Sequence, residues 1–236
     1  MVTIAQCQRL QSAWFAALAG ATGGKTFSTH GSTWAWLPAR RELMLMFPEQ
    51  ISAAGVRPAL AEGTRLGATT VGVWLNGAVR SAGLAELGFE PGWQPWWMAA
   101  PVTVPASYDA GTAALTTDVA EYRGPLSREL RVVKTQPRQA WHAEVRTSEG
   151  ICGAAYAFHP SGVHGLEGLG GIFNMEVLPD YQRRGFGTAL LSRAARAAAE
   201  AGARHLALNA TPEGYAFYSQ RGFTLVGRGK THWLTL

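Results

Sequence analysis

The chain has 236 residues, of which 47% are hydrophobic and 16% are charged, so it can bury a sizeable core and wholesale disorder is excluded. The net charge of +5 comes from basic residues that are scattered, apart from Arg183 and Arg184, which argues against nucleic-acid binding. No apolar run approaches the roughly 20 residues that span a bilayer, and Met1 to Gly20 lacks a signal-peptide pattern, so we expect a cytoplasmic protein without a membrane segment.

The first half of the chain predicts a mixture of helices and strands. Residues 6–18 have the spacing of an amphipathic helix, and the apolar runs at 34–37 and 43–47 are typical of strands. We expect residues 51–66 to form a helix interrupted at Pro58. Cys7 here, like Cys152 in the second half, is expected to be a buried small hydrophobic residue, because two cysteines are too few for a disulfide framework or a metal site.

Residues 100–111 contain several Pro, Ser and Gly residues and are predicted to be a linker. The segments on its two sides resemble each other. Gly67 and Gly88 lie 21 positions apart and enclose an apolar run, and Gly202 and Gly222 lie 20 positions apart and do the same. This similarity predicts two copies of one unit.

The second half predicts a layer of strands followed by alternating helices and strands, which indicates a mixed α/β sheet. Alternation at 141–146 predicts a half-buried strand with His142 and Glu144 on its polar face. The predicted elements are a helical stretch at 118–134, a hairpin turn at 148–150, strands at 141–146, 151–158 and 173–177, a helix at 185–201, a strand at 206–208, a short helix through Tyr218 and a last strand at 224–236.

The segment from Pro179 to Thr188 lies where a strand is predicted to end and a helix to begin. The first amides of a helix lack partners, so such a junction favours anions. Gly185 and Gly187 would let a pyrophosphate approach the backbone closely. A P-loop and a dinucleotide-binding fingerprint fit worse, since no Gly-Lys-Ser/Thr triplet occurs and Leu190 stands where a third glycine is needed. A tight turn without a ligand is the alternative.

The sequence Gln182-Arg-Arg-Gly-Phe-Gly187 resembles the pyrophosphate loop of the GNAT superfamily of acyl-CoA-dependent N-acyltransferases. Residues 208–214 and the pattern Tyr218-x-x-x-Gly222-Phe223 resemble a later motif of that family. The resemblance implies an α/β fold of two GNAT-like domains, each a mixed, mostly antiparallel sheet flanked by helices. Residues 1–105 would be a degenerate copy, because no such loop precedes Gly67, and residues 112–236 an acyl-CoA-binding domain.

The resemblance also implies a reaction and a site. A primary amine would attack acetyl-CoA directly in a ternary complex, with no metal, and a backbone amide near Val177 would stabilise the oxyanion. Tyr218 would protonate the departing thiolate, and our candidate base is Glu176, directly or through a water; a packed tyrosine and a surface glutamate are the alternatives. The residues expected to hold CoA are Met175, Val177, Gln182, Arg183, Arg184, Gly185, Phe186, Gly187, Thr188 and Asn209.

The acceptor is left open as a small-molecule or peptide amine, and the protein as a monomer or homodimer. Other functions considered are a non-catalytic acyl-CoA sensor or interaction module, and a nucleotide-binding oxidoreductase, which the missing third glycine disfavours. Seven of the nine tryptophans lie in the first half, where they could form core, an interaction surface or a wall of the acceptor pocket; they are Trp14, Trp34, Trp36, Trp74, Trp93, Trp96 and Trp97.

Overall fold

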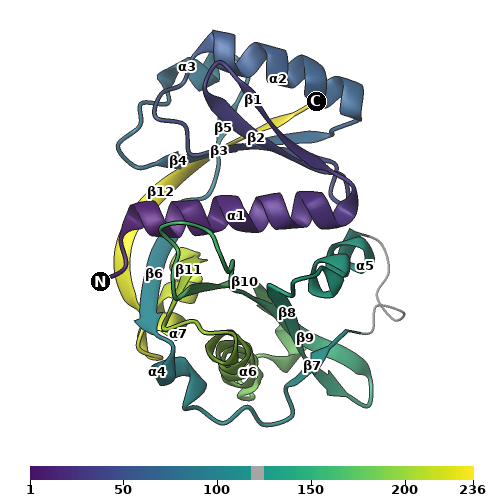
Figure 1. Ribbon diagram of the computed structural model, residues 1–236, viewed down its shortest axis with the longest axis vertical. Helices are drawn as coiled ribbons and strands as arrows, with labels where there is room; N and C mark the ends of the chain where they lie inside the picture. Colours follow the sequence, from purple (N-terminus) through teal and green to yellow (C-terminus); the bar gives the residue numbers. More distant parts are fainter. Residues whose placement is uncertain (118–124) are drawn as a thin grey trace.

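The computed structural model of the protein describes residues 1–117 and 125–236, and its elements are labelled in Figure 1. The N-terminal half comprises α1 (Ile4–Thr22), β1 (Lys25–Thr29), β2 (Ser32–Leu37), β3 (Glu42–Met46), α2 (Ala53–Leu66), β4 (Thr70–Asn76), α3 (Ala82–Ala85), β5 (Glu90–Pro91), β6 (Trp96–Pro101) and α4 (Thr103–Ala106). The C-terminal half comprises β7 (Ala114–Thr116), α5 (Pro125–Glu129), η1 (Leu130–Lys134), β8 (Ala140–Thr147), β9 (Gly150–Phe158), β10 (Leu169–Val177), η2 (Pro179–Tyr181), α6 (Phe186–Glu200), β11 (His205–Ala210), α7 (Pro212–Ser219) and β12 (Thr224–Thr235).

All the strands join one mixed sheet, in the order β1-β2-β3-β4-β12-β6-β11-β10-β9-β8-β7, with β5 paired to β12. The pairs β3/β4 and β10/β11 are parallel, and the other pairs are antiparallel. Helices flank this sheet (Figure 1). The expected fold class, a mixed α/β sheet flanked by helices, is therefore confirmed.

The two halves exchange their closing strands. β6 pairs with β11 on one side and with residues 224–228 of β12 on the other. Residues 229–235 of β12 pair with β4, and β5 pairs with the same part of β12. The set β4, β12, β5 thus repeats the arrangement of β11, β6, β12. Each half completes its sheet with a strand of the other, so the predicted units 1–105 and 112–236, whose limits stay a prediction, would share strands.

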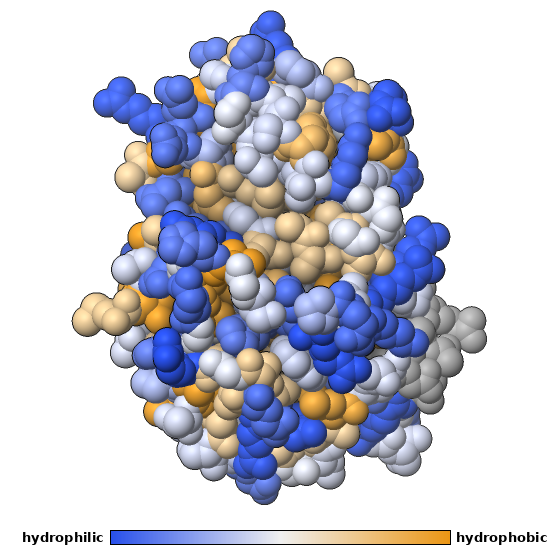
Figure 2. All heavy atoms as spheres, in the orientation of Figure 1, coloured by the Kyte–Doolittle hydropathy of each residue, from blue (hydrophilic) through white to orange (hydrophobic). Residues whose placement is uncertain are grey.

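Three apolar clusters lie between the layers. One packs α2 against β2 to β4, and another packs α6 against β8 to β11. The third surrounds α1, which runs between the strands of the two halves (Figure 1); Trp14 of α1 stacks on Phe173 of β10 with ring centroids 4.9 Å apart. On the face shown in Figure 2, apolar residues gather across the waist of the molecule over α1. This shared cluster ties the two halves together through burial of apolar surface.

Local signals explain the main helices. Thr3 and Gln6 form a reciprocal capping box at the start of α1, and Gly23, in the left-handed conformation, ends it. Helix α6 matches its predicted limits within one residue. Helix α2 differs from the prediction, because it continues through Pro58; a proline six residues into the helix removes one hydrogen bond, and the packing of Val56 and Ala59 offsets that loss.

Other expectations need correction. The predicted linker at 100–111 begins inside β6 and contains α4, because Pro101 pairs with His205 at the end of the shared sheet. Of the helical stretch expected at 118–134, residues 118–124 lie outside the described residues, and the rest forms α5 and η1. Cys7 and Cys152 are both buried and free, as expected. None of the described helices is long and apolar enough to cross a membrane.

The strand predicted to be half-buried at 141–146 is buried on both faces. His142 and Glu144 are only 2% and 5% exposed, because the cluster around α1 and η1 covers the face on which they lie. His142 packs against Tyr156 with ring centroids 4.7 Å apart. The pattern was misleading because a polar residue marks the solvent face only when nothing packs on that face.

Burial lowers the pKa of His142 from its ordinary value to about 4. Between pH 6.5 and 4 the unfolded chain therefore binds a proton at this position and the folded chain does not, so the free energy of unfolding falls as the pH falls, by at most about 1.4 kcal/mol per pH unit. We expect chemical denaturation of His142→Phe to show a shallower loss of stability from pH 7 to 5 than wild type. The exposed residue His164 provides the control, and equal slopes for His142→Phe and wild type would contradict the prediction.

Candidate active site

The two parallel strands at the centre of the C-terminal half separate along their length. β10 pairs with β11 only at residues 169–171, opposite 205–207, although β10 continues to Val177 and β11 to Ala210. A bulge interrupts the pairing of β10 with β9 between Phe173 and Glu176, and Asn174 has a positive φ of 48°. The two strands therefore splay apart. This splay exposes the backbone edge of β10 from Ile172 onward.

A groove of about 810 Å³ lies beside this splay, between the loop at 182–188 and helix α7. Its lining residues are Met175, Val177, Gln182, Arg183, Gly185, Gly187, Thr188, Glu213, Gly214, Ala216, Phe217, Tyr218, Gln220 and Arg221. Seven of the ten residues predicted to hold CoA are among them. The other three, Arg184, Phe186 and Asn209, are not.

The loop at 183–188 presents unpartnered backbone amides. Tyr181 and Gln182 donate to Leu178 and Pro179, and Ala189 donates to Gly185, but among the described residues none accepts a hydrogen bond from the amides between them. Arg183 and Gly185 have φ angles of 60° and 86°, which turn the chain tightly before α6 begins. A helix N-terminus with free amides and left-handed residues before it is a ready site for a pyrophosphate.

Other side chains shape this loop. Gln182 Nε2 donates to the carbonyl of Val177 at 3.0 Å, which ties the loop to the end of β10. Gly187 lies against helix α7, where a Cβ would come within 3.2 Å of the Phe217 ring. Arg184 lies 5.4 Å from the Tyr181 ring centroid, so its guanidinium stacks outside the groove. Gly187 and Phe217 therefore lie close together in the lining of the groove.

Arg221 is a groove residue that the sequence analysis did not identify. Its Nε donates to Thr188 Oγ1 at 2.9 Å, its Nη1 donates to the Phe217 carbonyl at 2.7 Å, and its guanidinium stacks 3.8 Å from the Phe217 ring centroid. Burial lowers the pKa of Arg221. A cation fixed in this way would attract a phosphate without losing much side-chain entropy. Its place next to the Gly222-Phe223 motif was the signal available in the sequence.

We expect Arg221→Met to weaken the binding of acetyl-CoA about 10-fold, because a charge-assisted contact to a phosphate is lost while the stem can still cover Phe217. Titration calorimetry with acetyl-CoA measures the change. Arg193→Met, in helix α6 and outside the groove lining, is the matched control. Equal affinities for Arg221→Met and wild type would place the phosphates elsewhere.

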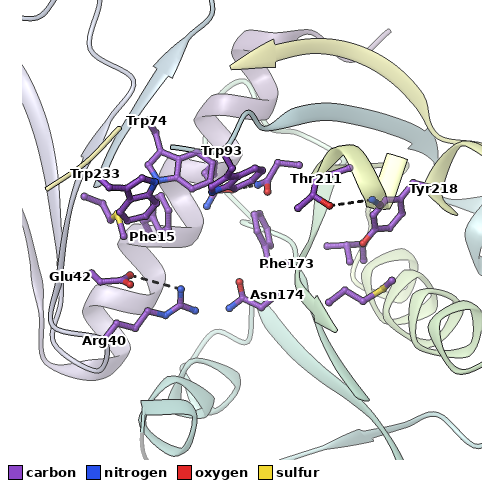
Figure 3. Close-up of a pocket in the computed structure, with 17 residues that line it drawn as sticks. Phe15, Arg40, Glu42, Trp74, Trp93, Phe173, Asn174, Thr211, Tyr218 and Trp233 are labelled. Atoms are coloured by element: carbon purple, nitrogen blue, oxygen red, sulfur yellow. Dashed lines mark hydrogen bonds and ion pairs between the residues drawn. The ribbon is translucent and has the colours of Figure 1, made fainter. Parts of the chain in front are cut away.

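A second, inner cavity of about 390 Å³ opens on the far side of the splay (Figure 3). Both halves line it: Gln11, Phe15, Arg40, Glu42, Met44, Trp74 and Trp93 come from the N-terminal half, and Ile172, Phe173, Asn174, Met175, Asn209, Ala210, Thr211, Gly214, Tyr218 and Trp233 from the C-terminal half. Met175, Gly214 and Tyr218 line the groove as well. The groove and the inner cavity therefore meet at these three residues.

Tyr218 is half-buried on α7, which Thr211 caps by accepting the amide of Gly214 at 3.1 Å. Its ring packs edge-on against Phe217 and Phe223. Burial raises the pKa of Tyr218 above its ordinary value, so the hydroxyl keeps its proton at neutral pH and can donate it. The candidate acid thus lines both cavities.

The structure separates two other predicted residues from the groove. Glu176 is exposed and lines neither cavity. Asn209 lines the inner cavity, where its Nδ2 donates to Gln11 Oε1 of α1 at 2.7 Å. The catalytic role of Glu176 and the CoA contact of Asn209 stay predictions that these positions do not favour.

The N-terminal half has no comparable opening between its parallel strands. β3 and β4 stay paired over all five residues of β3, from Glu42 opposite Thr70 to Met46 opposite Trp74, and Phe47 then donates to the Trp74 carbonyl at 2.9 Å. Among residues 1–117 and 125–236, no three His, Cys, Asp or Glu side chains gather as a metal site requires.

A splayed strand, a loop of free amides at the start of α6 and a tyrosine at the junction define a site for an extended anionic ligand. Residues 136–225 match the family model described as an acetyltransferase (GNAT) domain. Residues 136–225 therefore have the sequence pattern of a GNAT acetyltransferase domain. No curated protein matches the sequence significantly.

Solved structures share the fold over nearly the whole chain. A GCN5-related N-acetyltransferase from Kribbella flavida is 15% identical, covers 99% of this chain and 96% of its own, and has a TM-score of 0.66. A putative GNAT-family acetyltransferase from Novosphingobium aromaticivorans is 14% identical, with 93% and 97% coverage and a TM-score of 0.57. A tandem GNAT protein from the clavulanic acid biosynthesis pathway is 13% identical, with 86% and 78% coverage and a TM-score of 0.51.

Proposed function

We propose that the protein is an N-acetyltransferase that transfers the acetyl group of acetyl-CoA to a primary amine of a small molecule or peptide in a ternary complex. One observation carries the proposal: the groove and the inner cavity meet at Met175, Gly214 and Tyr218. A cosubstrate in the groove and an acceptor in the inner cavity would bring thioester and amine together beside the Tyr218 side chain.

The residues of the groove suit acetyl-CoA. The amides of 183–188 and the guanidinium of Arg221 would bind the phosphates, and the edge of β10 freed by the splay would pair with the amide groups of the pantetheine arm. A Cβ at Gly187 would come within 3.2 Å of the Phe217 ring, so a glycine keeps open the space between the loop and α7.

In the reaction, the lone pair of the neutral amine attacks the thioester carbon, and the carbonyl oxygen becomes an oxyanion. Backbone amides of the bulge at Asn174 and Met175, which have no register partner in β9, would stabilise that oxyanion. The C–S bond then breaks and the thiolate takes the proton of the Tyr218 hydroxyl. The nitrogen loses its extra proton to a water; Glu176, outside both cavities, could take part only through a chain of waters.

The test is an assay of purified protein with acetyl-CoA and a panel of primary amines, which reads both release of the CoA thiol and the acetylated product by mass spectrometry. Amine-dependent thiol release with matching product supports the proposal. Saturable acetyl-CoA binding without turnover of any amine would instead favour the alternative, a non-catalytic acyl-CoA-binding sensor or interaction module.

A further inference from the structure

The inner cavity has two chemically different ends. Tyr218 and Thr211 lie at the end that meets the groove, whereas Arg40 and Glu42 lie at the opposite end, with Phe173 and Asn174 between them (Figure 3). The thioester would lie at the Tyr218 end under the proposed function. A polar group at the Glu42 end would therefore bind a part of the acceptor other than the amine that reacts.

The far end carries an unbalanced negative charge. Arg40 donates its Nε and Nη2 to the two oxygens of Glu129, which is only 2% exposed, so that ion pair neutralises the guanidinium. Glu42 is left with Arg40 Nη1 at 4.0 Å, beyond hydrogen-bonding distance. Its buried Oε2 accepts no hydrogen bond from any described residue. Burial raises the pKa of Glu42 above its ordinary value, so the buried carboxylate needs a cation to stabilise its ionised form. With Glu42 ionised, one cation and two carboxylates have a formal charge of −1 that a bound cation would balance.

Aromatic side chains form the wall beside Glu42. Phe15, Trp74, Trp93 and Trp233 line this part of the cavity and lie together in Figure 3. Trp74 is 5% exposed and packs edge-on against Phe15 and Trp93, with centroids 5.6 Å and 5.5 Å away. Its Nε1 donates to no described residue. Indole and phenyl rings attract an organic cation through their electron-rich faces, and this attraction strengthens where water is excluded.

Two glycines make room for this wall. Trp233 of β12 stands opposite Gly72 of β4, and a Cβ at Gly72 would come within 2.7 Å of its indole. A Cβ at Gly92 would lie 2.3 Å from the same indole on another side. Any larger residue at either position would displace Trp233. The indole therefore fits in its position because both neighbours are glycines. The wall is a built feature of the cavity rather than a chance grouping of aromatic residues.

We propose that the acceptor is a molecule with two basic groups, one neutral amine that reacts beside Tyr218 and a second, protonated nitrogen that binds Glu42 and the tryptophan wall. For the amine that reacts beside Tyr218, this proposal rests on the proposed function. For the protonated nitrogen at Glu42, it rests on the charge and shape of the inner cavity. A cavity of about 390 Å³ is at the low end of the range for small-molecule sites, which favours a small diamine over a long chain.

The first experiment compares α,ω-diaminoalkanes with n-alkylamines of the same chain length as acceptors of wild-type protein and of Glu42→Gln. We expect wild type to prefer one or more diamines, and the ratio of kcat/KM for diamine over monoamine to fall about 10- to 100-fold in Glu42→Gln, because a charge-assisted hydrogen bond is lost. Glu86→Gln, exposed on the surface, is the control and should keep the wild-type ratio. Equal use of both amine series by wild type, with no change in Glu42→Gln, would overturn the proposal and leave the proposed function standing.

A second measurement does not depend on turnover or on the folding of Glu42→Gln. Titration of the wild-type protein with the same diamines, in the absence of acetyl-CoA, should change the tryptophan fluorescence saturably, and Gly92→Ala should weaken that binding. If acetyl-CoA is never used but diamines bind, the proposed function fails and the cation site stands. If none of the diamines changes the tryptophan fluorescence, the cation site is refuted, whether or not acetyl-CoA is used.

Discussion

Replacing Gly187 with valine is expected to weaken acetyl-CoA binding by about 100-fold or more. A Cβ at this position would lie 3.2 Å and 3.3 Å from two carbons of the Phe217 ring, and the Phe217 ring supports Arg221. The larger side chain would therefore push the Phe217 ring away. The guanidinium of Arg221, which stacks on that ring, would be displaced as well. Valine would also place a branched side chain beside the free amides of the first turn of α6.

Titration calorimetry with acetyl-CoA and with CoA measures this effect, and circular dichroism with thermal melting checks the fold. Gly83→Val is the matched control, because Gly83 is exposed and a Cβ there has no neighbour within 4 Å. If Gly187→Val bound acetyl-CoA as tightly as wild type, the loop at 182–188 would not be the pyrophosphate site.

The second large effect is expected for Tyr218→Phe, which should lower kcat by about 10²- to 10⁴-fold and leave the affinity for acetyl-CoA nearly unchanged. Phenylalanine keeps the ring contacts with Phe217 and Phe223 but removes the only hydroxyl hydrogen that this residue can give to the thiolate. The rate of the chemical step, and with it kcat, should therefore fall, whereas the binding of acetyl-CoA should not.

Steady-state kinetics with the best acceptor, together with the acetyl-CoA dissociation constant, separates the two quantities. Tyr215→Phe is the control, since Tyr215 lies on the same helix, packs against Trp96 and lines neither cavity. An unchanged kcat in Tyr218→Phe would remove this residue from catalysis. A parallel loss of acetyl-CoA affinity would indicate a role in shaping the groove instead.

Local signals in the sequence predicted the parts of the site that local structure determines. Gly185 and Gly187 at the start of the predicted helix at 185–201 indicated the turn into α6, and the strand predicted at 173–177 ends at the same residue as β10. Loop and helix residues within a few positions of each other fix these features. Seven of the predicted CoA-binding residues line the groove for that reason.

The remaining features depend on contacts between distant segments, which a single sequence does not show. No local signal indicates that β12 leaves its own half after Arg228 to pair with β4, or that β6 enters between β11 and β12. The inner cavity depends on this exchange, because Trp233 reaches it from the exchanged strand β12 and lies beside Trp74 of β4. The bulge between Phe173 and Glu176 likewise has no local signal in the sequence.

The most direct test of the proposed site is a crystal structure of the protein with CoA bound. We expect the pyrophosphate to lie against the amides of 183–188, a phosphate to lie within reach of Arg221, and the thiol to lie beside Met175, Gly214 and Tyr218. CoA bound away from the splay of β10 and β11, or with its thiol distant from Tyr218, would contradict this expectation.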